Sequence, residues 1–240
     1  MAIERIGDSD ELINQAEAYV LLRKKEGRLY QDDQLMALPL VVKNHQYYNE
    51  WRLRAKSFEK LKKHLYGRKG RLLDIGCGNG WMSHALAKFG FEVTGLDTNS
   101  MELEQANNVF NLPNLNWVLG DIFKWEPAKK FDCIVLSASM QYFKSLPNLV
   151  GKLKSLLAPK GEVIFMDSFF YSDTERKQAQ ERSRIYYKEM GVREMEKQYF
   201  HHCLSDLAAF NVSIIYQPLH PLIRKFTNSP PFPIINVKFE

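Results

Sequence analysis

The chain has 240 residues, of which 45% are hydrophobic and 25% are charged, and its net charge at pH 7 is +5. These values exclude a disordered chain or a low-complexity linker, and they fit one large globular domain. The charge excess is small for a nucleic-acid-binding protein. The three widely spaced cysteines cannot form a disulfide framework, and no run of 18 apolar residues predicts a membrane span. A cytoplasmic protein is therefore expected.

Two helices are predicted in the first part of the chain, over 9–26 and 47–66, from the helical spacing of apolar residues. The second helix also carries a basic stripe, made of Arg52, Lys56, Lys60 and Lys63. Such a stripe usually forms a solvated helix face, and contact with RNA is the alternative.

Short apolar runs alternate with helical patterns in the middle of the chain. The runs that predict strands cover 71–75, 92–96, 117–119, 131–137 and 162–167, and the helical patterns cover 81–89, 100–108 and 145–157. This alternation predicts an α/β fold with a doubly wound parallel sheet. The rest of the chain predicts helices over 174–190 and 194–209, then strands over 212–216 and 234–239 joined by a proline-rich connection.

The strongest motif follows the first of these strands, where Asp74 precedes Gly76, Gly78 and Gly80. Glycine has no side chain and tolerates positive φ, so a ligand can lie against the main chain there. Ligands of open α/β sheets bind at the carboxyl ends of the strands. The sequence therefore predicts a binding site beside this glycine-rich turn.

Two further acids end the next two strands. Asp97 has a spacing from the glycines that suits hydrogen bonds to both hydroxyls of a ribose, although it could also cap a helix. Asp121 could accept a hydrogen bond from the exocyclic amine of adenine while Ile122 packs on the ring, although it could also be a simple turn acid. The three acids together indicate a ligand that contains a nucleoside.

Two nucleoside ligands compete for this motif. Dinucleotides require G-x-G-x-x-G, but Trp81 stands where the last glycine would be. Asp74 would also repel a pyrophosphate, whereas it would welcome a cationic ligand. S-adenosylmethionine carries an ammonium and a sulfonium group and no phosphate, so it fits this pattern better.

The set of motifs resembles the class I S-adenosylmethionine-dependent methyltransferases, and it is most similar to their small-molecule branch of the ubiquinone-biosynthesis type. The segments that carry the resemblance are 72–80, Asp97, 120–121, 131–135 and 157–162, so it covers roughly residues 70–168. The resemblance implies a Rossmann-like seven-stranded sheet, mostly parallel with an antiparallel last strand. It also implies methyl transfer by in-line displacement, with S-adenosyl-L-homocysteine as the product.

Carried over by position, the resemblance implies cofactor contacts for Asp74, Gly76, Cys77, Gly78, Gly80, Asp97, Thr98, Asp121, Ile122 and Ser137. The glycine-rich turn would line the methionine part, with the Cys77 side chain read as packing. Asp97 would hold the ribose, Thr98 would flank adenine, and Ser137 would offer its backbone near the ammonium and methyl groups.

We expect a single domain with a helical cap over 1–69, a cofactor-binding core over 70–168, a lid insertion over 169–193, and a last helix and strands over 194–240. Tyr171, Tyr186, Tyr187 and Tyr199 make the predicted lid aromatic, which favours a small apolar or aromatic acceptor. The candidate catalytic bases are His45, Tyr142 and His201. No metal site is predicted, because the adjacent His201 and His202 would diverge on a helix.

The partners expected are therefore a small molecule and no membrane, in a monomer or homodimer. The segment after the strand at 131–137 lacks the Pro-Pro-aromatic motif of DNA amino-group methyltransferases, so nucleic acid is disfavoured. Two alternatives stay open: an RNA methyltransferase that uses the basic stripe, and a noncatalytic cofactor-binding protein on the same fold.

Overall fold

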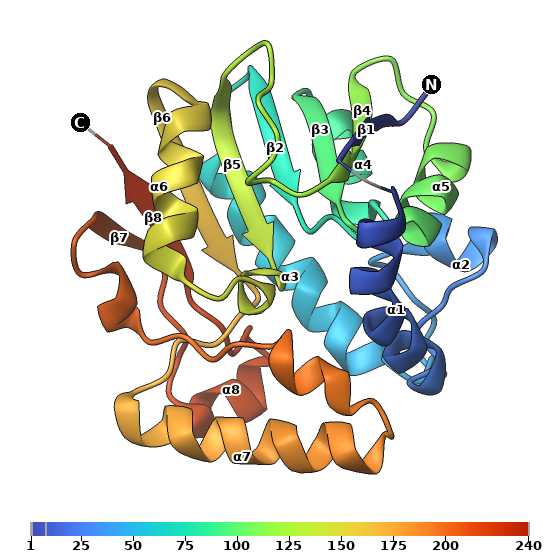
Figure 1. Cartoon of the computed structure of the whole chain (residues 1–240). Coiled ribbons are helices and arrows are strands. Elements are labelled where there is room, and N and C mark those ends of the chain that lie inside the picture. Colours follow the sequence, from blue (N-terminus) through green and yellow to red (C-terminus); the bar gives the residue numbers. More distant parts are fainter. Residues whose placement is uncertain (1, 8, 240) are drawn as a thin grey trace.

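The computed structural model of the chain describes residues 2–7 and 9–239. The ends of the predicted domain, Met1 and Glu240, lie outside these residues, as does Asp8. One eight-stranded sheet is flanked by helices, with the strand order β1-β4-β3-β2-β5-β6-β8-β7 (Figure 1). The strands are β1 (Glu4–Ile6), β2 (Arg71–Ile75), β3 (Glu92–Asp97), β4 (Leu115–Gly120), β5 (Phe131–Ser137), β6 (Leu157–Met166), β7 (Asn211–Tyr216) and β8 (Ile234–Lys238).

The predicted doubly wound α/β sheet is present, but it has eight strands, so the prediction of seven is wrong. β8 is antiparallel to β6 and β7, whereas β1 to β6 pair in parallel. The additional strand, β1, pairs with β4 and places Ile6 opposite Gly120. Its three residues are too few to show a sequence period. The strand fits because Gly120 lacks a Cβ, which would lie only 2.7 Å from the Ile6 Cβ.

Helices cover both faces of the sheet, and alternate residues of one strand enter different cores. Leu72 packs with α3 (Tyr48–His64), α4 (Trp81–Phe89) and α5 (Ser100–Val109), whereas Leu73 packs with α6 (Leu146–Leu156). This division follows from the two-residue period of a strand. Among the described residues, no helix is long and apolar enough to cross a bilayer.

Four further helices lie outside this central layer, and the chain also forms three 3₁₀ turns. The helices are α1 (Ser9–Lys25), α2 (Asp32–Ala37), α7 (Asp173–Glu189) and α8 (Pro221–Thr227), and the turns are η1 (Met140–Tyr142), η2 (Arg193–Lys197) and η3 (Leu204–Leu207). The first turn lies between β5 and α6, and the other two lie between α7 and β7. The sequence pattern predicted α1 and α7 but neither α2 nor α8.

The predicted helix over 194–209 is wrong, because only η2 and η3 form there. The segment between them is extended, and its backbone pairs with other parts of the chain. The Phe200 N–H donates to the Gln141 carbonyl at 2.7 Å, and the His202 carbonyl accepts from the Tyr171 N–H at 2.9 Å. These long-range bonds replace the local ones of a helix, and they leave His201 and His202 both buried.

The basic stripe of α3 packs against the C-terminal part of the chain. Arg52 donates to the Asn228 side chain at 2.8 Å, and the Lys56 ammonium donates to the Thr227 carbonyl at 3.0 Å. The Lys60 ammonium lies 3.9 Å from the centre of the Tyr216 ring. These three cations therefore hold α3 to the C-terminal part of the chain at α8 and β7.

A buried carboxylate connects α3, β6 and β8. Glu162, whose side chain is 2% exposed, accepts hydrogen bonds from Arg68 and Asn236 and lies 3.0 Å from the His64 ring nitrogen. Burial raises its pKa, but the hydrogen bonds with His64 and Arg68 outweigh burial and hold the pKa below its usual range. The charged carboxylate is therefore the form that stabilises this end of the sheet.

We expect Glu162→Gln to lower the free energy of unfolding by about 1–3 kcal/mol at pH 7, because it removes a buried charge that three groups stabilise. A depressed folded pKa contributes stability above the unfolded pKa, and this contribution is lost as the pH falls through the folded value. The difference in the free energy of unfolding between wild type and variant should therefore become smaller below about pH 4. Urea unfolding across this range measures it. The control is Glu59→Gln, at an exposed ion pair with Lys62, and an equal effect at Glu59 would contradict the prediction.

Candidate active site

The carboxyl ends of the central strands point toward α7, and α1 lies beside them (Figure 1). Two adjoining cavities open at this edge. A strand-end cavity of about 410 Å³ lies where β3, β4 and β5 end, and a glycine-loop cavity of about 130 Å³ lies beside the turn after β2. Tyr19, Gly76, Ala138 and Tyr142 line both.

Residues 76–80 form a turn, the glycine loop, that is fastened to the neighbouring strand β3. The amides of Gly76 and Cys77 both donate to the Leu96 carbonyl, at 2.8 and 3.2 Å. Gly76 has φ +67°, and a Cβ there would lie 2.4 Å from the Ser139 Cβ. Glycine is required at this position because η1 begins directly against the backbone of the loop.

Gly80, predicted to line the methionine part of the cofactor, lines neither cavity. Its φ is +74°, and a Cβ would come within 2.3 Å of the buried Trp117 ring. The glycine therefore allows α4 to begin close to β4. All the other predicted cofactor-binding residues line one of the two cavities: Asp74, Gly76, Cys77, Gly78 and Ser137 in the glycine-loop cavity, and Gly76, Asp97, Thr98, Asp121 and Ile122 in the strand-end cavity.

Asp97 joins the end of β3 to the glycine loop. Its carboxylate accepts hydrogen bonds from the Gly78 amide at 2.7 Å and from the Asn99 amide at 2.9 Å. Burial raises its pKa, and these backbone bonds oppose the rise. Both bonds fix the orientation of a carboxylate that lines the strand-end cavity, where it could accept further donors.

The end of β4 supplies the opposite side of the strand-end cavity. The Asp121 carboxylate accepts from the Phe123 amide at 2.9 Å, so it shapes its own turn as well as lining the cavity. Ile122 is 1% exposed and presents an apolar contact there. A carboxylate acceptor next to an apolar side chain suits a flat heterocycle that carries a hydrogen-bond donor.

Asp74 is a buried acid without a cationic partner among the described residues. It is 1% exposed, and its carboxylate accepts one side-chain hydrogen bond, from the Ser83 hydroxyl at 2.6 Å. Burial raises its pKa to about 7, and the nearby Asp97 contributes to the rise. Burial raises the pKa of Glu102, in the same cavity, to about 7 as well. Such acids are suited to hold a cation, which would restore their ordinary ionisation.

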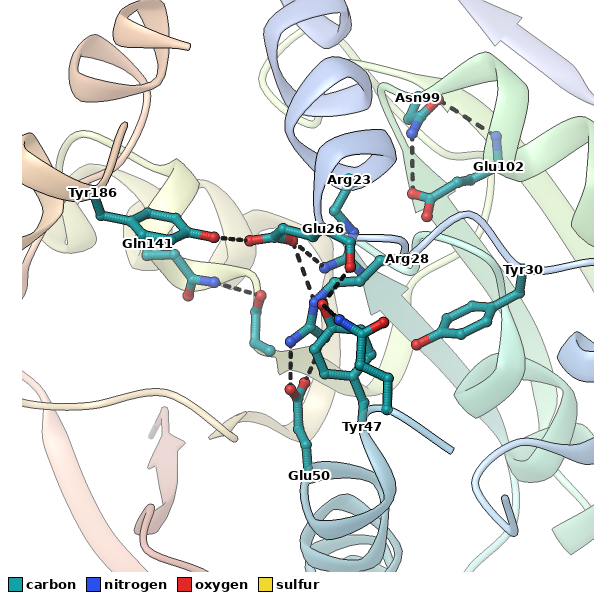
Figure 2. A network of polar contacts seen from close by, with 12 residues as sticks. Arg23, Glu26, Arg28, Tyr30, Tyr47, Glu50, Asn99, Glu102, Gln141 and Tyr186 are labelled. Atoms are coloured by element: carbon teal, nitrogen blue, oxygen red, sulfur yellow. Dashed lines mark hydrogen bonds and ion pairs between the residues drawn. The ribbon is translucent and has the colours of Figure 1, made fainter. Parts of the chain in front are cut away.

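A third cavity, of about 380 Å³, adjoins the glycine-loop cavity on the side of α7, and we call it the arginine cavity. Figure 2 shows its polar network. Arg28 donates to the Glu50 carboxylate from both terminal guanidinium nitrogens, Nη1 at 2.9 Å and Nη2 at 2.5 Å. Glu26 contacts Arg23, Arg28 and the Tyr186 hydroxyl. Arg54 adds a bond to Glu50 at 3.1 Å.

The sequence interpretation missed these charged residues. Arg23 and Glu26 belong to the end of α1 and the turn after it, and Glu50 and Arg54 to α3, so only packing of the N-terminal helices over the sheet brings them to the site. Trp51, also on α3, lines the glycine-loop cavity. The one available signal in the sequence was that Arg54 does not belong to the basic stripe of α3, which packs against α8.

The three candidate bases are separated. Tyr142 lines all three cavities. Although 38% of its surface is exposed, that surface faces these cavities, and burial raises its pKa to about 12. His201 and His45 line none of the three. The His201 ring nitrogen lies 2.9 Å from the Ser183 hydroxyl, and the His45 ring accepts from the Tyr47 amide at 3.0 Å.

Aromatic side chains of the predicted lid reach the arginine cavity. Tyr186 and Tyr187 of α7 line it together with Tyr199. The Tyr142 ring joins Tyr19 to Tyr199, with ring centres 5.6 and 5.8 Å apart. Tyr171 is absent from this lining. No group of three or more His, Cys, Asp or Glu side chains that could hold a metal is found among the side chains that the structure describes, those of residues 2–7 and 16–239.

Comparison with known proteins agrees with this geometry. The methyltransferase domain family matches residues 44–204, which is more than half of the chain. A malonyl-[acyl-carrier protein] O-methyltransferase of Halalkalibacterium halodurans is 36% identical over 110 residues, which is 43% of this chain and 40% of the relative. A ubiquinone biosynthesis O-methyltransferase of Coxiella burnetii is 32% identical over 101 residues, 40% of this chain and 43% of the relative. The chain thus spans less than half the length of these curated relatives.

A solved structure shows the same fold over nearly the whole chain. The plantazolicin methyltransferase BpumL, crystallised with a pentazolic desmethylPZN analog and SAH, is 15% identical, with a TM-score of 0.55 over 97% of this chain and all of the other. The sequence motifs, the fold and the family match agree. The chain therefore belongs to the methyltransferase domain family and has the fold of class I S-adenosylmethionine-dependent methyltransferases.

Proposed function

We propose that the chain transfers a methyl group from S-adenosylmethionine to a small-molecule acceptor. The observation that carries the proposal is the placement of three acids at the ends of consecutive strands: Asp74, Asp97 and Asp121 line two cavities that share the glycine loop. The family match and the O-methyltransferase names of the relatives support it. A small molecule is also favoured because three cations of the basic stripe pack against α8 and β7.

The residues present fit this cofactor. The strand-end cavity would take the adenosine part, with Asp97 on the ribose hydroxyls and Asp121, Ile122 and Thr98 around adenine. The glycine-loop cavity would take the methionine part, because a buried acid of raised pKa, Asp74, suits an ammonium group there. When bound, the cofactor supplies a methyl group on a positively charged sulfur, which is a good leaving group.

The protein then has mainly to position the acceptor and exclude water. The arginine cavity, which adjoins the methionine part of the site, would hold the acceptor. We propose that α1 and α3 of the segment 1–69 act as a cap, and α7 as a lid, over a core at 70–168, because side chains of these three helices line this cavity. The cytoplasmic location and the monomeric or dimeric state stay predictions, and the three cysteines are free and buried.

Asp97→Asn should weaken S-adenosylmethionine binding by about 1–3 kcal/mol, or roughly 5- to 150-fold, because it replaces an acceptor that would serve two ribose hydroxyls. Calorimetric titration measures the affinity. The matched control is Glu104→Gln, on the exposed outer surface of α5 in an ion pair with Arg5. Equal affinities for Asp97→Asn and wild type would remove this residue from the site, and tight NAD binding in place of S-adenosylmethionine would reject the function.

Affinity for S-adenosylmethionine should also rise with pH between about 5.5 and 7, by up to tenfold per pH unit. The free Asp74 carboxyl has a pKa of about 7, so below that value it must lose a proton before it can pair with an ammonium group. Above pH 7 the dependence should level off. Calorimetric titrations of S-adenosylmethionine in buffers of different ionisation enthalpy measure how many protons are released on binding.

Asp74→Asn should remove most of this slope, because the neutral side chain has no proton to release. Glu102→Gln is the informative comparison, since Glu102 lines the same cavity and its pKa is raised to a similar value. If the affinity for S-adenosylmethionine still rises with pH in Asp74→Asn but no longer does so in Glu102→Gln, the ammonium site is assigned to Glu102 instead.

A further inference from the structure

The arginine cavity has a charge pattern that selects among methyl acceptors. Its described lining contains four cations, Arg23, Arg28, Arg54 and Arg182, and two acids, Glu26 and Glu50. The glycine-loop cavity adds two acids, Asp74 and Glu102, so the two cavities together contain four acids and four arginines. In the strand-end cavity, Asp97 and Asp121 are matched by Lys144 and Lys197. The described lining of the three cavities is thus neutral overall when every acid is ionised.

S-adenosylmethionine itself brings a net positive charge, because it has an ammonium and a sulfonium group but one carboxylate. The loaded site would therefore contain one positive charge without a partner. A cationic acceptor would add to this imbalance in a partly enclosed space, where charges interact more strongly than in water. An anionic acceptor would cancel it.

Two arginines are available to receive such an anion. Arg23 has one ion-pair contact, to Glu26 at 3.5 Å, and its buried Nε has no hydrogen-bond partner. Arg182 of α7 makes no hydrogen bond or ion pair with any side chain that the structure describes, and it lines the same cavity. Arg28 and Arg54, in contrast, are both bound to Glu50.

The same cavity offers little for deprotonating an acceptor. Its described lining includes no histidine, lysine or cysteine. Burial raises the pKa of Tyr142 to about 12 and also raises the pKa values of Tyr19, Tyr186, Tyr187 and Tyr199. Burial would raise the pKa of Glu50 too, but its bonds to arginine lower it to about 2. The remaining acid, Glu26, is already bound by Arg23, Arg28 and the Tyr186 hydroxyl. An amine or alcohol must lose a proton during methylation, and the described lining of this cavity offers no free base to take it.

We propose, on the basis of the proposed function, that the methyl acceptor is the carboxylate of a small organic acid, held by Arg23 and Arg182 in the arginine cavity. A carboxylate oxygen forms the bond to the methyl carbon while the carbon–sulfur bond breaks and its electron pair stays on sulfur. The negative charge of the acid and the positive charge of the sulfonium cancel, and a methyl ester and a neutral thioether result. No proton is released, so no base is needed.

The test compares acids with amines and alcohols of the same carbon skeleton: benzoate, benzylamine and benzyl alcohol, and hexanoate, hexylamine and hexanol. Transfer of labelled methyl from S-adenosylmethionine is followed, and the product is treated with alkali, which frees methanol from methyl esters but not from methylamines or ethers. Calorimetric titration of each compound into the protein saturated with sinefungin, an analogue that carries an ammonium group in place of the methylated sulfonium and cannot transfer methyl, measures binding independently of turnover. We expect the acids alone to bind and to give alkali-labile label.

Arg182→Gln tests the assignment of the anion site. We expect a roughly five- to tenfold rise in KM for the acid, because a charge-assisted hydrogen bond is lost, with little change in kcat or in S-adenosylmethionine affinity. The matched control is Arg184→Gln, two residues away on α7, where the guanidinium binds Glu181 at 2.8 and 2.6 Å and lies outside the arginine cavity. Equal KM values for the two variants would remove Arg182 from the site.

Failure of this inference differs from failure of the proposed function. If S-adenosylmethionine binds but no acid binds or is methylated, or if an amine or alcohol is the better acceptor, the carboxylate proposal is overturned and the methyltransferase proposal stands. If S-adenosylmethionine does not bind, the proposed function itself fails.

Discussion

The whole site depends on how the glycine loop is fastened to its neighbouring strand. The Leu96 carbonyl accepts from two loop amides, and the Asp97 carboxylate accepts from a third, that of Gly78. These bonds fix the loop backbone against the end of β3, so that both the loop and Asp97 face the same space. A loop free to move would separate the methionine side of the site from the ribose side.

Around this fixed loop the chain arranges two different electrostatic environments. On the sheet side, Asp74 and Glu102 are buried acids with pKa values near 7, which favour a cation. On the side of α1, α3 and α7, arginines outnumber acids and the tyrosines have raised pKa values. A sulfonium donor and an anionic acceptor would complement these two environments, and their charges would cancel as the methyl group moves between them.

The sequence alone predicted the central fold well because its signals are local. Strands such as β2 and β5 are short, mostly apolar runs that end at polar or glycine-rich turns, and their bounds agree with the structure. The prediction from the sequence is wrong where tertiary contacts replace local ones. The helix expected over 194–209 became extended because residues such as Phe200 pair with distant backbone, and β1 was overlooked because its fit depends on the missing side chain of Gly120.

The sequence determined the class of site for the same reason: Asp74, Gly76 and Asp97 lie at the carboxyl ends of strands, and these ends must meet at one edge of a parallel sheet. Only the tertiary structure decided what covers that site. Arg23, Glu50 and Arg182 belong to helices far apart in the chain, and nothing in their local sequence shows which face they turn inward. Likewise, only packing showed that Gly80 serves the contact with Trp117, because a glycine needed for a close approach of protein to protein looks the same in sequence as one needed for a ligand.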